Sequence, residues 1–187
     1  MSGMNRFLAI VSCLFLLVGG IGAAVAQDES ASQPPPEEMT QQPQEADVEV
    51  TQHQDWEVRC PKSDASLPCE MTQLVQNPDN DQPIMRVVMG YPAETNGKPA
   101  MILLLPLGVR LDAGVKLAVD GHQVDHFPFQ VCFEQGCQTA FQLEDSVLNR
   151  MKNGNKATVS IVDPSGDPLT LDISLLGFTA SNEQIAP

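Results

Sequence analysis

The chain has 187 residues, of which 24 are acidic and 10 are basic, so its formal net charge is −14 at pH 7. A protein with this charge and no basic stripe is repelled by nucleic acids and by anionic lipid surfaces, which excludes nucleic-acid binding. A partner for such an acidic surface is expected to be basic or to be bridged by divalent ions.

The first 26 residues have the three parts of a secretory signal peptide. Arg6 provides a single positive charge, an apolar run occupies residues 7–18, and the small residues end in an Ala-Val-Ala motif at Ala26, before Gln27. This pattern predicts export, with cleavage between Ala26 and Gln27. The apolar run is marginal against the ~20 residues that a membrane span needs. An uncleaved anchor is therefore the less favoured alternative, and the cleaved chain is not expected to span a membrane.

Residues 27–54 differ in composition from the rest of the mature chain. They contain no Lys, Arg or aromatic residue and are rich in Pro, Gln and Glu, and such a segment buries too little apolar surface to order itself. We expect a disordered acidic spacer here and one globular domain at 55–180, since about 125 residues support a single core. Residues 181–187 are expected to form a C-terminal tail.

Short apolar segments separated by turns succeed one another through the domain. Segments in which apolar and polar residues alternate, or in which apolar residues run continuously, predict strands. These segments are residues 55–60, 69–76, 84–90, 100–105, 109–111, 115–119, 127–133, 157–162 and 169–175. An Asp-Gly pair at 120–121 predicts a tight hairpin, and the spacing of Val147, Leu148 and Met151 predicts one short helix. The domain is therefore predicted to be all-β, a sandwich or barrel with one short helix.

Four cysteines remain after the predicted cleavage: Cys60, Cys69, Cys132 and Cys137. In an exported protein they are expected to form two disulfides, with three possible connectivities. The chain-entropy model predicts roughly 2–3 kcal/mol for each short loop and about 4–5 kcal/mol for a long cross pairing, so energy does not select the pairing. Local hairpin geometry favours Cys60–Cys69 and Cys132–Cys137, because opposed strand residues lie ~4.5–5.5 Å apart, within the disulfide range.

Two other uses of these cysteines are less favoured. Redox pairs use C-x-x-C at a helix N-terminus, whereas four residues separate Cys132 from Cys137 on a strand turn, where Gly136 can take a positive φ. Zinc sites need paired C-x-x-C spacing or added histidines, and neither is present. A structural disulfide pair is therefore the preferred interpretation.

One polar stretch has the donor types of a transition-metal site: Asp120, His122, Asp125 and His126. On a strand, however, the two histidines would lie about 13 Å apart, too far to bind one ion, so we predict no metal site and no cofactor. The sequence also lacks a G-x-S-x-G motif and a Gly-rich phosphate loop. We therefore predict no catalytic residues and a protein that is not an enzyme.

Five motifs occur in order through the domain: DWEVRC at 55–60, CEM at 69–71, LPLGVRLDAGVKLAVDG at 105–121, FQVC at 129–132 with GC at 136–137, and LGFTA at 176–180. Together they resemble the invasion-associated locus B family of bacterial exported proteins. The resemblance implies an immunoglobulin-like β-sandwich in the periplasm or outer envelope of a Gram-negative bacterium. Only the sandwich architecture is implied, because the antibody order Cys…Trp…Cys is absent. The family has no assigned catalytic residues to carry over.

The expected function is inferred from the export signal and the resemblance together. We expect a non-enzymatic, disulfide-bonded envelope protein that binds a protein or envelope component in the periplasm, through strand edges or loops. The alternative is a surface-exposed virulence factor that aids attachment to, or invasion of, host cells through a host protein. An envelope hydrolase or a redox enzyme is the least favoured class.

Overall fold

Eleven strands in two antiparallel sheets make up about half of residues 48–62, 66–77 and 80–187, the part of the chain that the computed structural model describes. The larger sheet, called sheet A, has the strand order β1 (Val48–His53), β2 (Trp56–Pro61), β3 (Glu70–Gln76), β4 (Pro83–Gly90), β5 (Ala100–Leu105), β9 (Gly136–Gln142) and β8 (Val131–Phe133). The smaller, sheet B, has the order β11 (Pro168–Ser174), β10 (Lys156–Val162), β6 (Val115–Val119) and β7 (His122–Phe127).

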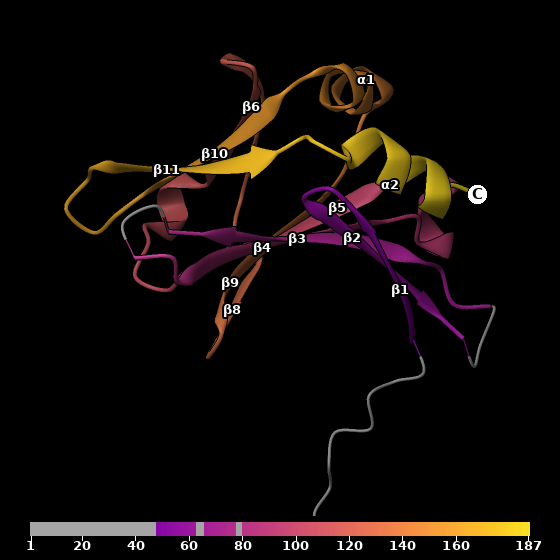
Figure 1. Cartoon of the computed structure of the whole chain (residues 1–187). Helices are drawn as coiled ribbons and strands as arrows, with labels where there is room; N and C mark the ends of the chain where they lie inside the picture. Colours follow the sequence, from indigo (N-terminus) through magenta and orange to yellow (C-terminus); the bar gives the residue numbers. More distant parts are fainter. Residues whose placement is uncertain (1–47, 63–65, 78–79) are drawn as a thin grey trace, which may run out of the picture. The chain divides into compact units, whose positions relative to one another are not determined.

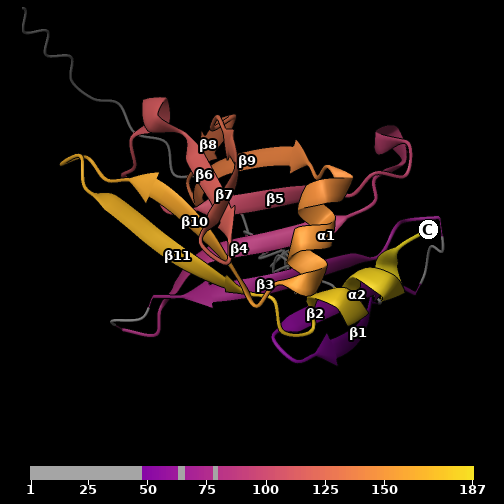
Figure 2. The same cartoon turned by 90° about the horizontal axis from the view of Figure 1, so that it is seen from above.

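Two helices, α1 (Asp145–Asn153) and α2 (Phe178–Ile185), and two short 3-10 turns, η1 (Ala93–Thr95) and η2 (Leu111–Ala113), complete the described elements. Sheet B and both helices lie on the same side of sheet A (Figures 1 and 2). The prediction of an all-β, two-sheet protein is confirmed. The strand order, with five consecutive strands in sheet A, differs from that of antibody domains.

The covered side of sheet A forms one core with sheet B and the helices. On β5, Met101, Leu103 and Leu105 alternate into this core and are at most 1% exposed, because successive strand residues point to opposite faces. They belong to the same buried cluster as Leu117 and Val159 of sheet B.

Trp56 connects sheet A to both covering layers. Its ring is fully buried and meets Phe178 of α2 edge-on, with ring centroids 5.4 Å apart. Its indole Nε1 donates a hydrogen bond of 2.8 Å to the carbonyl oxygen of Ser174 on β11. The only tryptophan of the chain therefore fixes the position of α2 and β11 over β2.

The prediction of a single helix is wrong, because α2 occupies 178–185 and extends into the predicted tail at 181–187. Its buried residues, Phe178, Ser181, Asn182 and Ile185, have the i, i+3, i+4, i+7 spacing of one helix face. Two of these four are polar, so the hydrophobic pattern was too weak to indicate a helix.

The ordered domain also begins before the predicted boundary at residue 55. Strand β1 lies inside the predicted spacer, 27–54, and pairs with β2 along its whole length. Its two valines, Val48 and Val50, lie on the side of sheet A away from the core, so the strand lacks the usual alternation of buried apolar residues. The remainder of the spacer, 27–47, and the predicted signal peptide, 1–26, lie outside the described residues.

The single strand expected at 127–133 is two strands in different sheets. β7 ends at Phe127 in sheet B, and β8 begins at Val131 in sheet A. Pro128 lies between them and lacks the N–H that a continuous ladder requires. The chain therefore crosses from one sheet to the other at this point, although the apolar alternation continues.

Candidate functional site

The structure joins Cys60 to Cys69 and Cys132 to Cys137 by disulfide bonds. The Cα atoms are 4.3 and 4.0 Å apart, and the second pair is directly opposed in the β8–β9 register. These are the two pairs that local geometry favours. Gly136, at the turn of the second hairpin, has the positive φ of 151° expected of it, and a Cβ there would collide with the carbonyl oxygen of Leu105.

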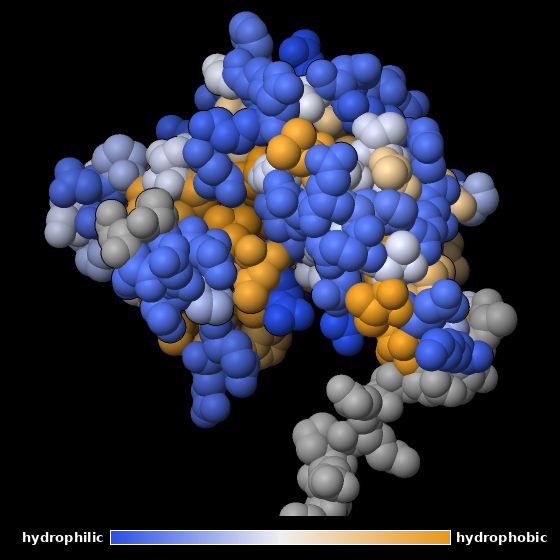
Figure 3. All heavy atoms as spheres, in the orientation of Figure 1, coloured by the Kyte–Doolittle hydropathy of each residue, from blue (hydrophilic) through white to orange (hydrophobic). Residues whose placement is uncertain are grey.

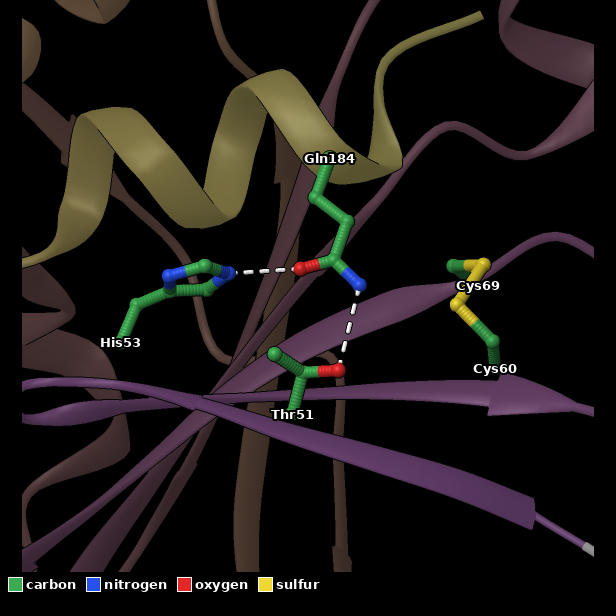
Figure 4. The surroundings of a disulfide bond; sticks show 5 residues. All are labelled: Thr51, His53, Cys60, Cys69 and Gln184. Carbon is green, nitrogen blue, oxygen red and sulfur yellow. Dashed lines mark hydrogen bonds between the residues drawn. A yellow bond between two sulfur atoms is a disulfide. The ribbon is translucent and has the colours of Figure 1, made fainter.

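The Cys60–Cys69 bridge lies beside the place where α2 contacts β1 (Figure 4). Gln184 of α2 points towards the strand, with its Oε1 2.6 Å from Nε2 of His53 and its Nε2 3.4 Å from Oγ1 of Thr51. Gly177, which precedes the helix, has φ 85°, and a Cβ there would collide with the backbone carbonyl of His53. These contacts hold the C-terminal helix on β1 and have no evident catalytic role.

The polar stretch at 120–126 has structural contacts. Asp120 accepts hydrogen bonds from the backbone N–H groups of Asn155 and Lys156 at 3.1–3.2 Å, which joins the β6–β7 turn to the start of β10. The Nε2 atom of His126 lies 2.9 Å from the carbonyl oxygen of Ala113. Within 48–62, 66–77 and 80–187, no three His, Cys, Asp or Glu side chains gather as a metal-binding set.

The side of sheet A that faces away from sheet B is the strongest candidate for a binding site. The cross-strand register places on it a set of apolar side chains that Arg86 and Gln138 interrupt. This set is here called the apolar patch: Leu74, Val88, Ile102, Leu104, Val131 and Phe133. Exposed fractions reach 49% for Leu74 and 53% for Phe133. Apolar atoms are exposed among hydrophilic ones in the region of β4 and β9 (Figure 3).

A hollow of about 330 Å³ adjoins the patch on β1 to β4. Its lining is mostly polar: Gln52, Asp55, Glu57, Arg59, Thr72, Gln73, Leu74 and Arg86. Gln73 is 7% exposed and its amide is fully engaged, because it bonds to the backbone of Asp55 and to both backbone polar groups of Ser174. Gln73 thus joins β3, which borders the hollow, to β11 of sheet B.

The charges around the hollow are only partly paired. Glu57 and Arg59 form an ion pair of 2.9 Å. Among the described residues, neither Arg86 nor Asp55 has an ion-pair partner. Arg86 lies between two members of the apolar patch, Leu74 on β3 and Leu104 on β5. This guanidinium is therefore available to a carboxylate from another molecule.

One further polar contact lies at the margin of the domain. The hydroxyl of Tyr91 donates a hydrogen bond of 2.7 Å to Oδ1 of Asn182, which is 1% exposed. Burial raises the pKa of Tyr91, and the bond to Asn182 partly offsets this effect. The phenol remains a neutral donor at physiological pH and serves to position α2.

Sequence analysis missed the apolar patch, although a signal for it was present. The run at 100–105 is apolar at every position and was expected to form a buried strand. Met101, Leu103 and Leu105 are indeed buried, but Ile102 is 37% exposed. A strand that is apolar on both faces indicates either two covered faces or one face reserved for a partner.

Three comparisons place the chain among known proteins. The family model for the invasion associated locus B (IalB) protein matches residues 56–186. Invasion protein B homologs from Brucella abortus strain 2308 and from Brucella abortus biovar 1 strain 9-941 are each 28% identical over 135 residues, covering 71% of this chain and 76% of the relative.

A solved structure agrees with the fold. The crystal structure of invasion associated protein B from Bartonella henselae matches with a TM-score of 0.65 and 18% identity, covering 73% of this chain and 95% of that one. None of the helices in the described ranges is long and apolar enough to cross a membrane. Because the family model spans well over half of the sequence, the chain belongs to the invasion associated locus B family.

Proposed function

We propose that this protein is exported to the periplasm and acts there by binding a protein or another envelope component, without catalysing a reaction. The observation that carries this proposal is the apolar patch, on the side of sheet A that no described helix or strand covers, here called the open side. Antiparallel sheets that face water usually have polar side chains on that side, whereas an exposed apolar patch marks an interaction site. The two disulfides support export, since such bonds persist in oxidising compartments.

A second candidate function is favoured by the names of the relatives. The Brucella proteins are described as invasion protein B homologs, so a role in contact with host cells is the alternative. It requires that the domain be displayed outside the cell. Labelling intact cells with a membrane-impermeant amine-reactive biotin distinguishes a periplasmic domain from one that is displayed outside the cell. A known periplasmic protein is the control. The periplasmic proposal predicts labelling only after the outer membrane is permeabilised, and labelling of intact cells would favour host contact.

The binding surface can be tested in living cells by site-specific photo-crosslinking. A photo-reactive amino acid in place of Ile102, on the apolar patch, should give a discrete adduct with an envelope component that mass spectrometry identifies. The matched control position is Thr170, which is exposed on strand β11 of sheet B and should give none. Equal adducts at both positions, or none at Ile102, would contradict the proposed site.

A further inference from the structure

We infer that a pocket at one end of the open side of sheet A binds a single apolar side chain of a partner protein, next to a basic residue of the same partner. The inference rests on the proposed function, because it names the chemistry of the partner that this side binds. Val88 and Ile102 belong to the apolar patch and also line the pocket, so the pocket extends the patch towards the end of β4.

The pocket exists because two neighbouring positions on this side lack a large side chain. Gly90 of β4 and Ala100 of β5 are directly opposed in the register. Both line a hollow of about 140 Å³, together with Val88, Ile102 and Pro92 among others. A cavity of ~150 Å³ accepts one benzene ring. The pocket therefore has room for one Leu, Met or Phe side chain and is too small for a long acyl chain.

The backbone does not require a glycine at position 90. The φ of Gly90 is not positive, and its register with β3 and β5 shows no shift. A Cβ there would meet only the carbonyl oxygen of Cys69, at an ordinary contact distance of 3.6 Å. Each other glycine in the described ranges has either a positive φ or a Cβ that would collide. Glycine weakens a strand, and where no bulge explains it, it often marks the close approach of a ligand or another chain.

Glu70 gives the edge of the pocket a negative charge. It is exposed on β3, directly opposite Gly90, and lines the pocket. Arg59 lies opposite Glu70 on β2 but forms its ion pair with Glu57, at 2.9 Å. Among the described residues, Glu70 itself has no ion-pair partner. A Lys or Arg of the partner complements this charge, and the net charge of −14 also attracts a basic partner.

This arrangement matches the way in which protein interfaces are anchored. A few side chains that fill pockets carry most of the binding energy, and the contacts around them mainly exclude water. Here the pocket at Gly90 provides the anchoring position, and the rest of the apolar patch provides the surrounding contacts.

The chemistry of the pocket can be tested on the full oxidised chain with the probe acetyl-Leu-Lys-amide, followed by the NMR shifts of the Gly90 and Ala100 amides. These shifts should saturate. Acetyl-Ala-Lys-amide should bind about tenfold more weakly, because it buries less apolar surface, and acetyl-Leu-Glu-amide about two- to fivefold more weakly, because an exposed charge contributes little. No saturable shift, or equal binding of the three probes, would overturn the inference.

The role of Glu70 is tested with the same probes. Glu70→Lys should remove the preference for the Lys probe over the Glu probe. Glu183→Lys makes the same change in net charge at an exposed position of α2 and should keep the preference. Loss of the preference in both variants would mean that the overall charge, and not Glu70, selects a basic residue.

Filling the pocket tests whether the partner in the cell uses it. Gly90→Leu should remove the in-cell adduct at Ile102, whereas Thr170→Leu adds the same side chain at an exposed position of sheet B and should keep it. Circular dichroism establishes that each variant is folded, and Ala100→Leu fills the pocket from the neighbouring strand if Gly90→Leu is unfolded.

The outcomes of this experiment separate the inference from the proposed function. An adduct that persists when the pocket is filled, or an adduct with a lipid in place of a protein, would overturn the inference and leave the proposed function standing. The absence of an adduct at Ile102 in the otherwise wild-type chain would contradict both.

Discussion

The two sides of sheet A are built from the same strands but have different surroundings. On β5 the residues at 101, 103 and 105 are enclosed by sheet B and the helices, whereas Ile102 is 37% exposed and Leu104 is half-buried. On β5 the two sides are similarly apolar, whereas on β2 and β3 the open side carries Glu57, Arg59 and Thr72. Burial on the first side stabilises the fold, whereas on the second side part of the apolar surface is in contact with water.

The largest expected effect on the covered side comes from Trp56. Replacing it by Ala removes a fully buried ring and its hydrogen bond to Ser174, so the free energy of unfolding should fall by about 3–5 kcal/mol. Denaturant titration monitored by circular dichroism measures this loss. A loss below about 1 kcal/mol would mean that the covering layer is not held by this residue.

The sharpest comparison uses two neighbouring residues of β5. Met101→Ala should cost about 2–5 kcal/mol, because it opens a cavity in the core. Ile102→Ala should cost about 1 kcal/mol or less, as expected of a residue that keeps part of its surface in water. Both are measured as unfolding free energies under identical conditions. Similar losses for the two variants would show that the open side is packed in the isolated protein.

Removal of the Cys60–Cys69 disulfide tests whether the covered and the open side of sheet A are energetically independent. Removing it with Cys60→Ala and Cys69→Ala together should lower the unfolding free energy by about 2–3 kcal/mol. The in-cell adduct at Ile102 should be unchanged, because the bridge lies beside α2 on the covered side of sheet A (Figure 4). The Cys132/Cys137 double variant is the control for loop length, since its cysteines are 5 positions apart in place of 9. Its stability loss should be smaller.

Sequence patterns predicted the covered side better than the open side. Trp56 and Val58 alternate into the core, and the four cysteines lie in two local hairpins, so both features could be inferred from short segments. Strand β1 was missed because its pairing with β2 depends on backbone hydrogen bonds and not on an apolar face. The exposure of Ile102 could not be inferred, because an apolar run is equally expected of a strand covered on both sides, and only the folded structure shows that no described helix or strand covers this side of β5.

The smallest expected effect concerns an ion pair on the protein surface. Nη2 of Arg110 donates a hydrogen bond of 2.7 Å to Asp112, and this bond is the main reason that the pKa of Asp112 lies below its ordinary value of 3.8. A carboxylate with a lowered pKa in the folded state adds stability above its unfolded pKa, and this stability is lost as the pH falls through the folded pKa.

Water screens this pair strongly, because the two side chains are 50% and 70% exposed. We therefore expect Asp112→Asn to have almost the same unfolding free energy as wild type at pH 7, with the small remaining difference disappearing in acid. NMR titration of the Asp112 carboxyl carbon reads the lowered pKa directly. A large stability loss at pH 7 would mean that this solvent-exposed ion pair stabilises the fold about as much as a buried contact on the covered side of sheet A. That result would contradict the contrast between the two sides.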